Sequence, residues 1–290
     1  MRRGPVAPQR GARRAGGEPR GYLYLPDYVS AAERADVLAW LATLHPIWEM
    51  RYPTSRPPPV GKQQRPLLRP VYWLGNWQFA GLDYYHPPKG IANRCVAAEP
   101  YPKVLAAIVA RAEALVRAKL APSDVPPQWH LNTCLVNFYG NRQVTDAAGK
   151  NKWVDCARVG EHRDFEPGPV VSLSFGERAL LQFIPHGRHV NPAPVKQEWL
   201  ADRSLQVFGG SYWKDETLHR VQRVETKTKA LLGPAIEGFA TRRINFTFRY
   251  VPVAHVVPYA KLSAQARHDV HGYMQQLATH SPFFAAALRG

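Results

Sequence analysis

The segment His162-Arg163-Asp164 places an imidazole and a carboxylate two positions apart. In a β-strand, residues two apart project from the same face, so these side chains would converge on one point. They would supply two of the three protein ligands of a mononuclear iron centre. The spacing alone is weak evidence, because a chain with eleven histidines contains such pairs by chance. A third ligand is needed before a metal site can be inferred.

His219, in the run ETLHRVQRV, is the leading candidate for that third ligand. It opens a predicted strand later in the chain, on the far side of an expected β-sandwich. Two histidines and one carboxylate on one face of an iron leave three coordination positions for co-substrate and oxygen, as in non-haem Fe(II) oxygenases. Three other histidines compete with it on sequence grounds: His186, His189 and His255.

The segment RINFTFR, residues 243 to 249, alternates between polar and apolar side chains without a break. As a strand it has one polar face, made by Arg243, Asn245, Thr247 and Arg249. The opposite face is apolar, made by Ile244, Phe246 and Phe248. Half-buried strands commonly alternate in this way. Two arginines flanking an amide and a hydroxyl are more specific, because forked guanidinium groups can hold a dicarboxylate by charge-assisted hydrogen bonds.

These motifs together resemble those of the AlkB-type Fe(II)/2-oxoglutarate-dependent dioxygenases. RINFTFR is similar to the family signature R-x-N-x-T-F-R, and it follows the His-x-Asp pair and the distal histidine in the family order. Asn137-Phe138-Tyr139 resembles the N-x-Y motif, and VVSLSFG resembles the strand after the metal aspartate. The resemblance covers residues 128 to 252, and a weaker one reaches back to about residue 64.

The resemblance implies that His162, Asp164 and His219 bind Fe(II) and form the catalytic centre, with 2-oxoglutarate and O2 as co-substrates. We expect Arg243 to form the salt bridge to the distal carboxylate of 2-oxoglutarate. For Arg249 two roles stay open: contact with that co-substrate, or support of the network on the metal side. The full set of expected 2-oxoglutarate residues is Asn137, Tyr139, Arg243, Asn245 and Arg249.

The resemblance also implies a substrate side. Glu166, two positions after the metal aspartate, is expected to read the substrate base, with an exposed loop acid as the alternative. In the family the segment before the sandwich forms a nucleotide-recognition lid, and residues 69 to 88 here are rich in aromatic rings with arginines nearby. Stacking on an extruded base requires such rings. We expect Trp73, Tyr84 and Tyr85 to bind substrate, while half of the rings could belong to the core.

Composition is consistent with a nucleic-acid substrate. The 290-residue chain has a net charge of +16, and a charge of this size attracts polyanions. No apolar stretch is long enough to cross a membrane. The three cysteines form no C-x-x-C pair, which suits a reducing compartment. We therefore expect a monomer without membrane contact, located in the cytoplasm or associated with a nucleus or nucleoid.

The expected fold is α+β, with a double-stranded β-helix (jelly-roll) core, flanking N-terminal helices and the recognition lid. Helices are predicted at about 30–44, 102–120 and 263–279, and the insert between Tyr139 and His162 is predicted to be a hairpin turning near Gly149. We divide the chain into a disordered arginine-rich tail (1–20), an N-terminal extension with the lid (21–127), the dioxygenase core (128–255) and a C-terminal helical extension (256–290).

The function expected from the resemblance is DNA repair by direct reversal of N-alkyl damage. The enzyme would oxidatively demethylate bases such as 1-methyladenine and 3-methylcytosine and release formaldehyde and succinate. Two alternatives stay open: the same chemistry on RNA, for instance tRNA, and hydroxylation of a protein or lipid, which would not need the aromatic lid.

Overall fold

The computed structural model describes residues 19–51, 65–78, 95–187 and 193–290. The tail before residue 19 and the part of the expected lid that holds Tyr84 and Tyr85 lie outside these ranges.

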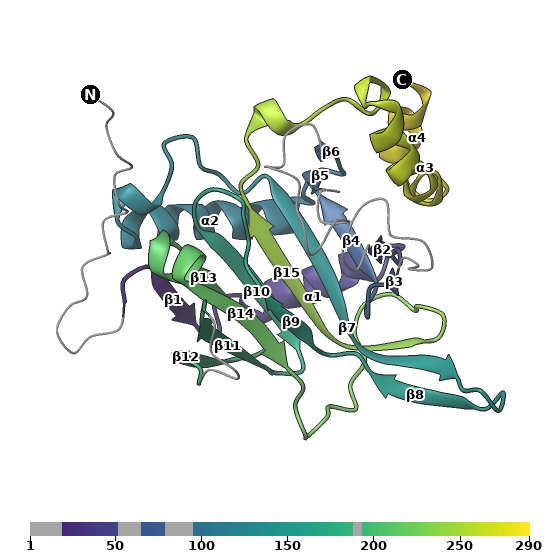
Figure 1. Ribbon diagram of the computed structural model, residues 1–290, viewed down its shortest axis with the longest axis horizontal. Helices are drawn as coiled ribbons and strands as arrows, with labels where there is room; N and C mark the ends of the chain where they lie inside the picture. Colours follow the sequence, from purple (N-terminus) through teal and green to yellow (C-terminus); the bar gives the residue numbers. More distant parts are fainter. Residues whose placement is uncertain (1–18, 52–64, 79–94, 188–192) are drawn as a thin grey trace.

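Two antiparallel sheets face each other (Figure 1). The larger has seven strands in the order β1-β13-β10-β15-β7-β4, with β8 paired to β7, and the smaller has four in the order β12-β11-β14-β9. The large-sheet strands are β1 (Tyr22–Leu25), β4 (Val71–Leu74), β7 (Thr133–Thr145), β8 (Asn151–Asp155), β10 (Val170–Gly176), β13 (Ser204–Phe208) and β15 (Phe239–Arg249). The small-sheet strands are β9 (Val159–His162), β11 (Ala179–Pro185), β12 (Lys196–Leu200) and β14 (Thr217–Gln222).

The connectivity is that of a jelly roll. From β7 onward the chain passes repeatedly between the two sheets, so β10 and β15 are neighbours in the large sheet while β11 and β14 are neighbours in the small one. Every pairing along these sheets is antiparallel. This arrangement confirms the expected α+β class with a double-stranded β-helix core. Two further pairs are outside the sandwich: β2 (Met50–Arg51) with β3 (Arg65–Pro66), and β5 (Asn76–Gln78) with β6 (Cys95–Ala97).

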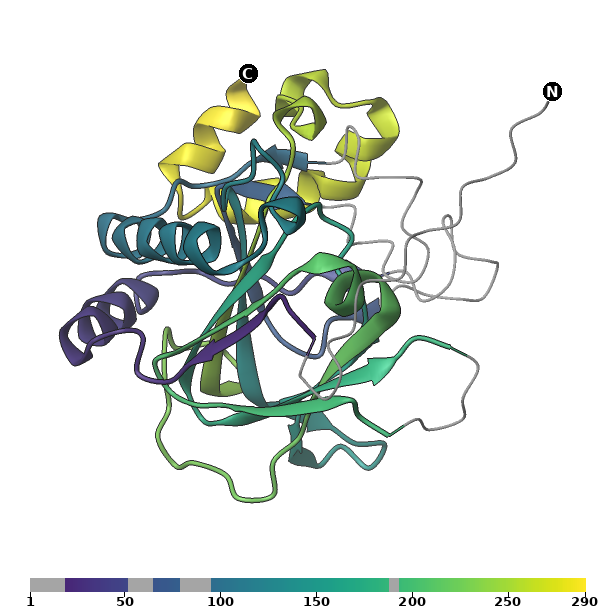
Figure 2. The same cartoon turned by 90° about the vertical axis from the view of Figure 1, so that its left-hand side faces the viewer.

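Helices α1 (Ala31–Leu41) and α2 (Lys103–Lys119) pack on the outer face of the large sheet (Figure 2). The apolar face of β15 meets them there: the Trp40 and Phe246 rings stack at 6.3 Å between centroids. The alternation of RINFTFR therefore separates a core face from a polar face, as predicted. The buried apolar cluster on this side takes residues from all three segments expected after the tail.

Helix α1 begins as predicted and ends earlier. Ser30 accepts a hydrogen bond from the Glu33 amide and Glu33 caps the Ser30 amide, which completes a capping box. The helix ends at Leu41 instead of about residue 44. Pro46 disfavours helical geometry at His45, the residue before it, so a helix in this segment must end before that position.

The C-terminal extension holds two helices where one was expected. Helix α3 (Ala264–Ala278) begins at the predicted cap, with Ser263 accepting from the Ala266 amide. A break then allows Ser281 to cap α4 (Pro282–Arg289), whose first residue is a proline. The remaining short helical turns are Pro122–Asp124, Tyr212–Glu216, Val253–His255 and Tyr259–Lys261.

The insert between Tyr139 and His162 forms the predicted hairpin. Strands β7 and β8 pair from Asn141↔Asp155 to Thr145↔Asn151 and turn at Gly149, whose φ is 78°. The positive φ explains the glycine. None of the described helices is long and apolar enough to span a bilayer.

Candidate metal centre and co-substrate cavity

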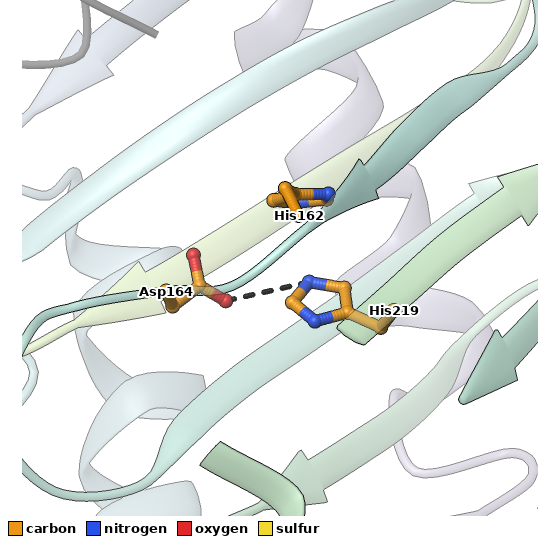
Figure 3. A group of neighbouring side chains, drawn as sticks. All are labelled: His162, Asp164 and His219. Atoms are coloured by element: carbon orange, nitrogen blue, oxygen red, sulfur yellow. Dashed lines mark ion pairs between the residues drawn. The ribbon is translucent and has the colours of Figure 1, made fainter. Parts of the chain in front are cut away.

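The small sheet places two of the three expected metal ligands opposite each other. His162 ends β9, and its register partner on the antiparallel strand β14 is His219. The ring centroids are 4.1 Å apart, and both rings lie beside Asp164 (Figure 3). Directly opposed residues in an antiparallel pair have neighbouring side chains. The register of one strand pair is therefore enough to bring together two histidines that are distant in sequence.

Asp164 reaches the centre by a different route from the one predicted. Strand β9 ends at His162, so Asp164 lies in the loop that follows and does not share a strand face with the histidine. Its Oδ2 lies 3.5 Å from Nε2 of His219. The prediction that Asp164 shares a strand face with His162 is therefore wrong, although the resulting cluster is the expected one. Asp164 lies beyond the end of β9, so its position is fixed by side-chain contacts and not by the hydrogen bonds of the sheet.

The cluster fits a metal ion. One potential ligand atom from each of His162, Asp164 and His219 lies within 4.8 Å of the other two. The Nδ1 of His162 lies 2.9 Å from the Gly160 carbonyl. A carbonyl can only accept, so Nδ1 carries the proton and Nε2 has the lone pair that a metal needs.

The histidines are also in the right protonation state. Burial lowers the pKa of His162, and burial together with the neighbouring His162 ring holds the pKa of His219 well below its ordinary value. Both imidazoles are therefore neutral near pH 7. Neutral imidazole is the form that binds a metal.

Arg249 anchors the carboxylate ligand. Its Nε and Nη2 donate to Oδ1 of Asp164 at 2.7 Å and 2.6 Å, which leaves Oδ2 on the side of His219. Burial would raise the pKa of Asp164, but the charge of Arg249 above all, together with that of Lys214, holds it well below its usual range. Arg249 also approaches Glu166, with 3.6 Å between Nε and Oε1. Of the two roles expected for Arg249, these contacts correspond to the metal-side network.

The large sheet presents the expected 2-oxoglutarate residues as neighbours. In the register of β15 with β7, Arg243 faces Tyr139 and Asn245 faces Asn137. All four line one cavity of about 400 Å³ that also contains the metal cluster. That volume is in the range of small-molecule sites.

Arg243 is a buried cation with no carboxylate partner among the described residues. It is 3% exposed, its Nη2 donates to Ser174 at 3.1 Å, and its guanidinium lies 4.8 Å from the Tyr139 ring centroid. Among the described residues, no acceptor meets its Nε or Nη1 and no carboxylate forms an ion pair with it. Burying such a charge without a partner is costly. A carboxylate ligand in the cavity would supply the missing partner, which fits 2-oxoglutarate.

Asn245 and Asn137 hold the neighbouring groups in place. The Asn245 amide donates to Ser172 Oγ at 2.7 Å and to the Leu173 carbonyl at 2.9 Å. The Asn137 oxygen accepts from Nε of Arg69 at 2.8 Å. Part of the hydrogen-bonding capacity of each amide is therefore used within the protein, and their contact with 2-oxoglutarate stays a prediction.

Arg69 lines the cavity, whereas the sequence indicated it only as a basic residue that flanks the aromatic lid. Its guanidinium lies 4.8 Å from the Tyr139 ring centroid, the same distance as that of Arg243. Tyr139 is thus flanked by two guanidinium groups. The Arg-Pro pair before β4 was visible as part of the lid motif, but the pairing of β4 with β7 that brings it here is non-local.

The substrate-side predictions have mixed outcomes. Trp73 lines the cavity and donates its indole N–H to Glu49 at 2.6 Å. Tyr84 and Tyr85 lie outside the described residues. Glu166 is 4% exposed and lines the cavity, so the alternative of an exposed loop acid is excluded. Some aromatic rings of the expected lid belong to the core, which was the alternative interpretation, because Trp77 is fully buried.

Phe165 is a cavity residue that the sequence did not reveal. It lies between the metal carboxylate and Glu166, lines the cavity, and is 52% exposed. An aromatic ring both lining the cavity and reaching solvent marks its mouth. Among the competing histidines, His186 and His255 are not part of the metal cluster, and His189 lies outside the described residues.

A jelly roll with two histidines and one carboxylate at its open interior defines the class of mononuclear non-haem iron oxygenases. Comparison with known proteins agrees. Residues 21–249 match the model of the 2OG-Fe(II) oxygenase superfamily. The chain belongs to this superfamily, which confirms the family resemblance seen in the sequence. The AlkB-type motifs all lie within the matched residues.

A solved structure described as "The structure of OsALKBH1" is similar over 81% of this chain and 100% of that one, at 20% sequence identity and a TM-score of 0.47. No curated protein sequence matches the chain. Enzymes of the superfamily use Fe(II), 2-oxoglutarate and O2, and the donor set of the cluster fits Fe(II).

Proposed function

We propose that the chain oxidatively demethylates N-alkylated nucleobases of the 1-methyladenine and 3-methylcytosine type, in DNA in the first instance, with release of formaldehyde and succinate. The observation that carries this proposal is the buried carboxylate of Glu166 in the cavity of the metal cluster. It gives the cavity a negative group that is itself neither an expected metal ligand nor an expected 2-oxoglutarate residue.

The charge of Glu166 favours a cationic base. Its Oε1 faces Arg249, whereas Oε2 meets no hydrogen-bond partner among the described residues. A buried carboxylate oxygen without a donor is unfavourable and is stabilised by a ligand that brings one. Bases methylated at N1 of adenine or N3 of cytosine carry a positive charge and an exocyclic amino group. They can therefore offer both charge and donor to Glu166.

Apolar groups in the same cavity favour a flat ring. Trp73 and Phe165 line it together with the guanidinium-bearing Arg69. Aromatic faces and guanidinium planes stack on bases irrespective of sequence. A protein or lipid substrate would not require this combination.

When bound, Fe(II) with 2-oxoglutarate and O2 supplies the oxidising chemistry that hydroxylates a C–H bond. The chain contributes positioning. His162, Asp164 and His219 would hold the metal, Arg243 would hold the co-substrate by its distal carboxylate, and Glu166 would orient the methylated edge of the base toward the metal.

The test is to measure formaldehyde after incubation with Fe(II), 2-oxoglutarate and oligonucleotides that carry 1-methyladenine or 3-methylcytosine. Single-stranded DNA, duplex DNA and methylated tRNA are compared. We expect formaldehyde from at least one DNA substrate, in step with succinate. Formaldehyde from tRNA alone would replace DNA by RNA in the proposal, and none from any of the three would refute nucleic-acid demethylation.

A further inference from the structure

We propose that the β7–β8 hairpin is a docking element for single-stranded nucleic acid, in which Trp153 stacks on a base and the lysines beside it contact phosphates. The inference rests on the proposed function, because it concerns how a nucleic-acid substrate would be held outside the cavity.

The hairpin extends beyond the sandwich (Figure 1). Strand β8 pairs with β7 and with no other described strand, so its outer edge is free. Trp153 lies at the middle of β8, opposite Gln143, and is 54% exposed. An exposed tryptophan on a free edge contributes little to folding, since burial of its ring is what would stabilise the chain. The same ring is well suited to stacking on a ligand.

The unpaired charges around Trp153 are positive on balance. Lys150 and Lys152 are exposed, and neither forms an ion pair with a described residue. Of the two nearby carboxylates, only Asp155 is ion-paired. Asp146 accepts from the Ala148 and Lys150 amides in the turn, and Asp155 binds Lys227 and Arg242. Among the described residues, the tip of the hairpin therefore has two unpaired lysines against the single unpaired carboxylate of Asp146, a net positive charge that favours a phosphate backbone.

The edge is unsuited to pairing with another protein strand. Lysine side chains on an edge strand disfavour the approach of a second strand, and Lys152 is the second of the five residues of this edge strand. A nucleic-acid strand gains from the same lysines. Stacking requires an accessible base face, which a single strand presents and a duplex does not.

The hairpin is also next to the metal centre along the chain. Strand β9 begins four positions after β8 ends, and His162 is its last residue. Trp153 pairs with Gln143 on β7, four residues beyond the cavity residue Tyr139. A nucleic-acid strand held at Trp153 would therefore lie roughly 13 Å along β7 from the cavity. Docking should change the KM for an oligonucleotide more than kcat.

The test measures binding by fluorescence anisotropy with the full chain, using unmethylated oligothymidylate and oligouridylate and a DNA duplex. The variants are Trp153→Ala, Trp153→Phe and the double change Lys150→Gln with Lys152→Gln. Trp199→Ala is the matched control, because Trp199 is 43% exposed on β12, beside Arg178. None of the substituted residues lines the cavity. A thermal melt of each variant shows whether it is folded, so a loss of binding can be distinguished from a loss of folding.

We expect Trp153→Ala to raise the Kd for single strands by about 5- to 100-fold, Trp153→Phe to restore most of the loss, and Trp199→Ala to have no effect. The double lysine change should raise Kd and reduce the slope of log Kd against log salt by about 1 to 2. Single strands should bind more tightly than the duplex.

Equal binding by wild type and Trp153→Ala would overturn the inference. So would self-association in sedimentation that Trp153→Ala abolishes, because the hairpin would then bind a second copy of the chain. The two proposals fail separately. Trp153-dependent binding without formaldehyde release would refute demethylation and keep the docking element, whereas formaldehyde release with unchanged Kd and KM in Trp153→Ala would refute only the docking element.

Discussion

His162 and His219 are register partners across β9 and β14, with 4.1 Å between their ring centroids. Two neutral imidazoles this close, with the carboxylate of Asp164 beside them, have little to gain from each other, because each offers a lone pair. A metal ion turns the arrangement into a favourable one. The relationship between these two residues is thus the core of the site.

The first prediction concerns the anchor of Asp164. Arg249→Met should lower the affinity for Mn(II), used as a redox-inert probe, by about 10- to 100-fold, because residues that orient a metal ligand contribute on this scale. Calorimetric titration would measure it. Arg220→Met is the control, since Arg220 pairs with the exposed Glu161. Equal affinity in Arg249→Met and wild type would show that Asp164 needs no anchor.

A second prediction concerns Arg243. Arg243→Ala should raise the KM for 2-oxoglutarate by roughly 10- to 150-fold, because it removes a charge-assisted bond of about 1.5–3 kcal/mol. Arg243→Lys should recover part of the loss, since a lysine keeps the charge and loses the forked geometry. Initial rates of succinate formation would report both. An unchanged KM in Arg243→Ala would assign the distal carboxylate to another group, of which Arg69 is the nearest alternative on the Tyr139 ring.

Glu166 gives a third prediction. Glu166→Gln keeps the size of the side chain and removes its charge, so it should reduce kcat/KM for a cationic methylated base more than for a neutral one. A loss of about 10-fold or more in the preference for 1-methyladenine over a neutral N-methylated base is expected from a buried charge-assisted hydrogen bond. Competition between the two oligonucleotides in one reaction measures the ratio. A ratio equal to that of wild type would remove Glu166 from substrate recognition.

A fourth prediction concerns stability and pH. Glu33 forms the capping box of α1, and its hydrogen bond from Arg111 lowers its pKa to about 2. A depressed pKa adds stability that is fully present above the ordinary carboxyl pKa and is lost as the pH falls toward 2. Glu33→Gln should therefore lower the free energy of unfolding by about 1 kcal/mol at pH 7 and by less at pH 3. Urea unfolding at the two pH values tests this, and a constant difference would contradict it.

Features with a strict local period could be predicted from the sequence. The alternation of residues 243–249 assigned Ile244 and Phe246 to the core and Arg243 and Asn245 to the cavity, because strand side chains alternate with period two. The capping box at Ser30 and the turn at Gly149 were likewise visible, since each depends on a few neighbouring residues.

Features that depend on loops or on pairing between distant strands could not be predicted from the sequence. Asp164 was placed on a strand, but the loop after β9 and the contact with Arg249 determine its position. Arg69 enters the cavity because β4 pairs with β7, a register that no local pattern encodes. Phe165 gave no signal at all, since a single aromatic residue between two acids has no period.

The most direct test of the account is whether 2-oxoglutarate binding depends on a metal held by His162, Asp164 and His219. Calorimetric titration with Mn(II) and then 2-oxoglutarate should give one of each per chain in wild type, and 2-oxoglutarate should bind only after the metal. His219→Ala should abolish metal binding while its circular dichroism spectrum is unchanged. Stoichiometric Mn(II) and 2-oxoglutarate binding by a folded His219→Ala variant would contradict the assignment of the metal centre.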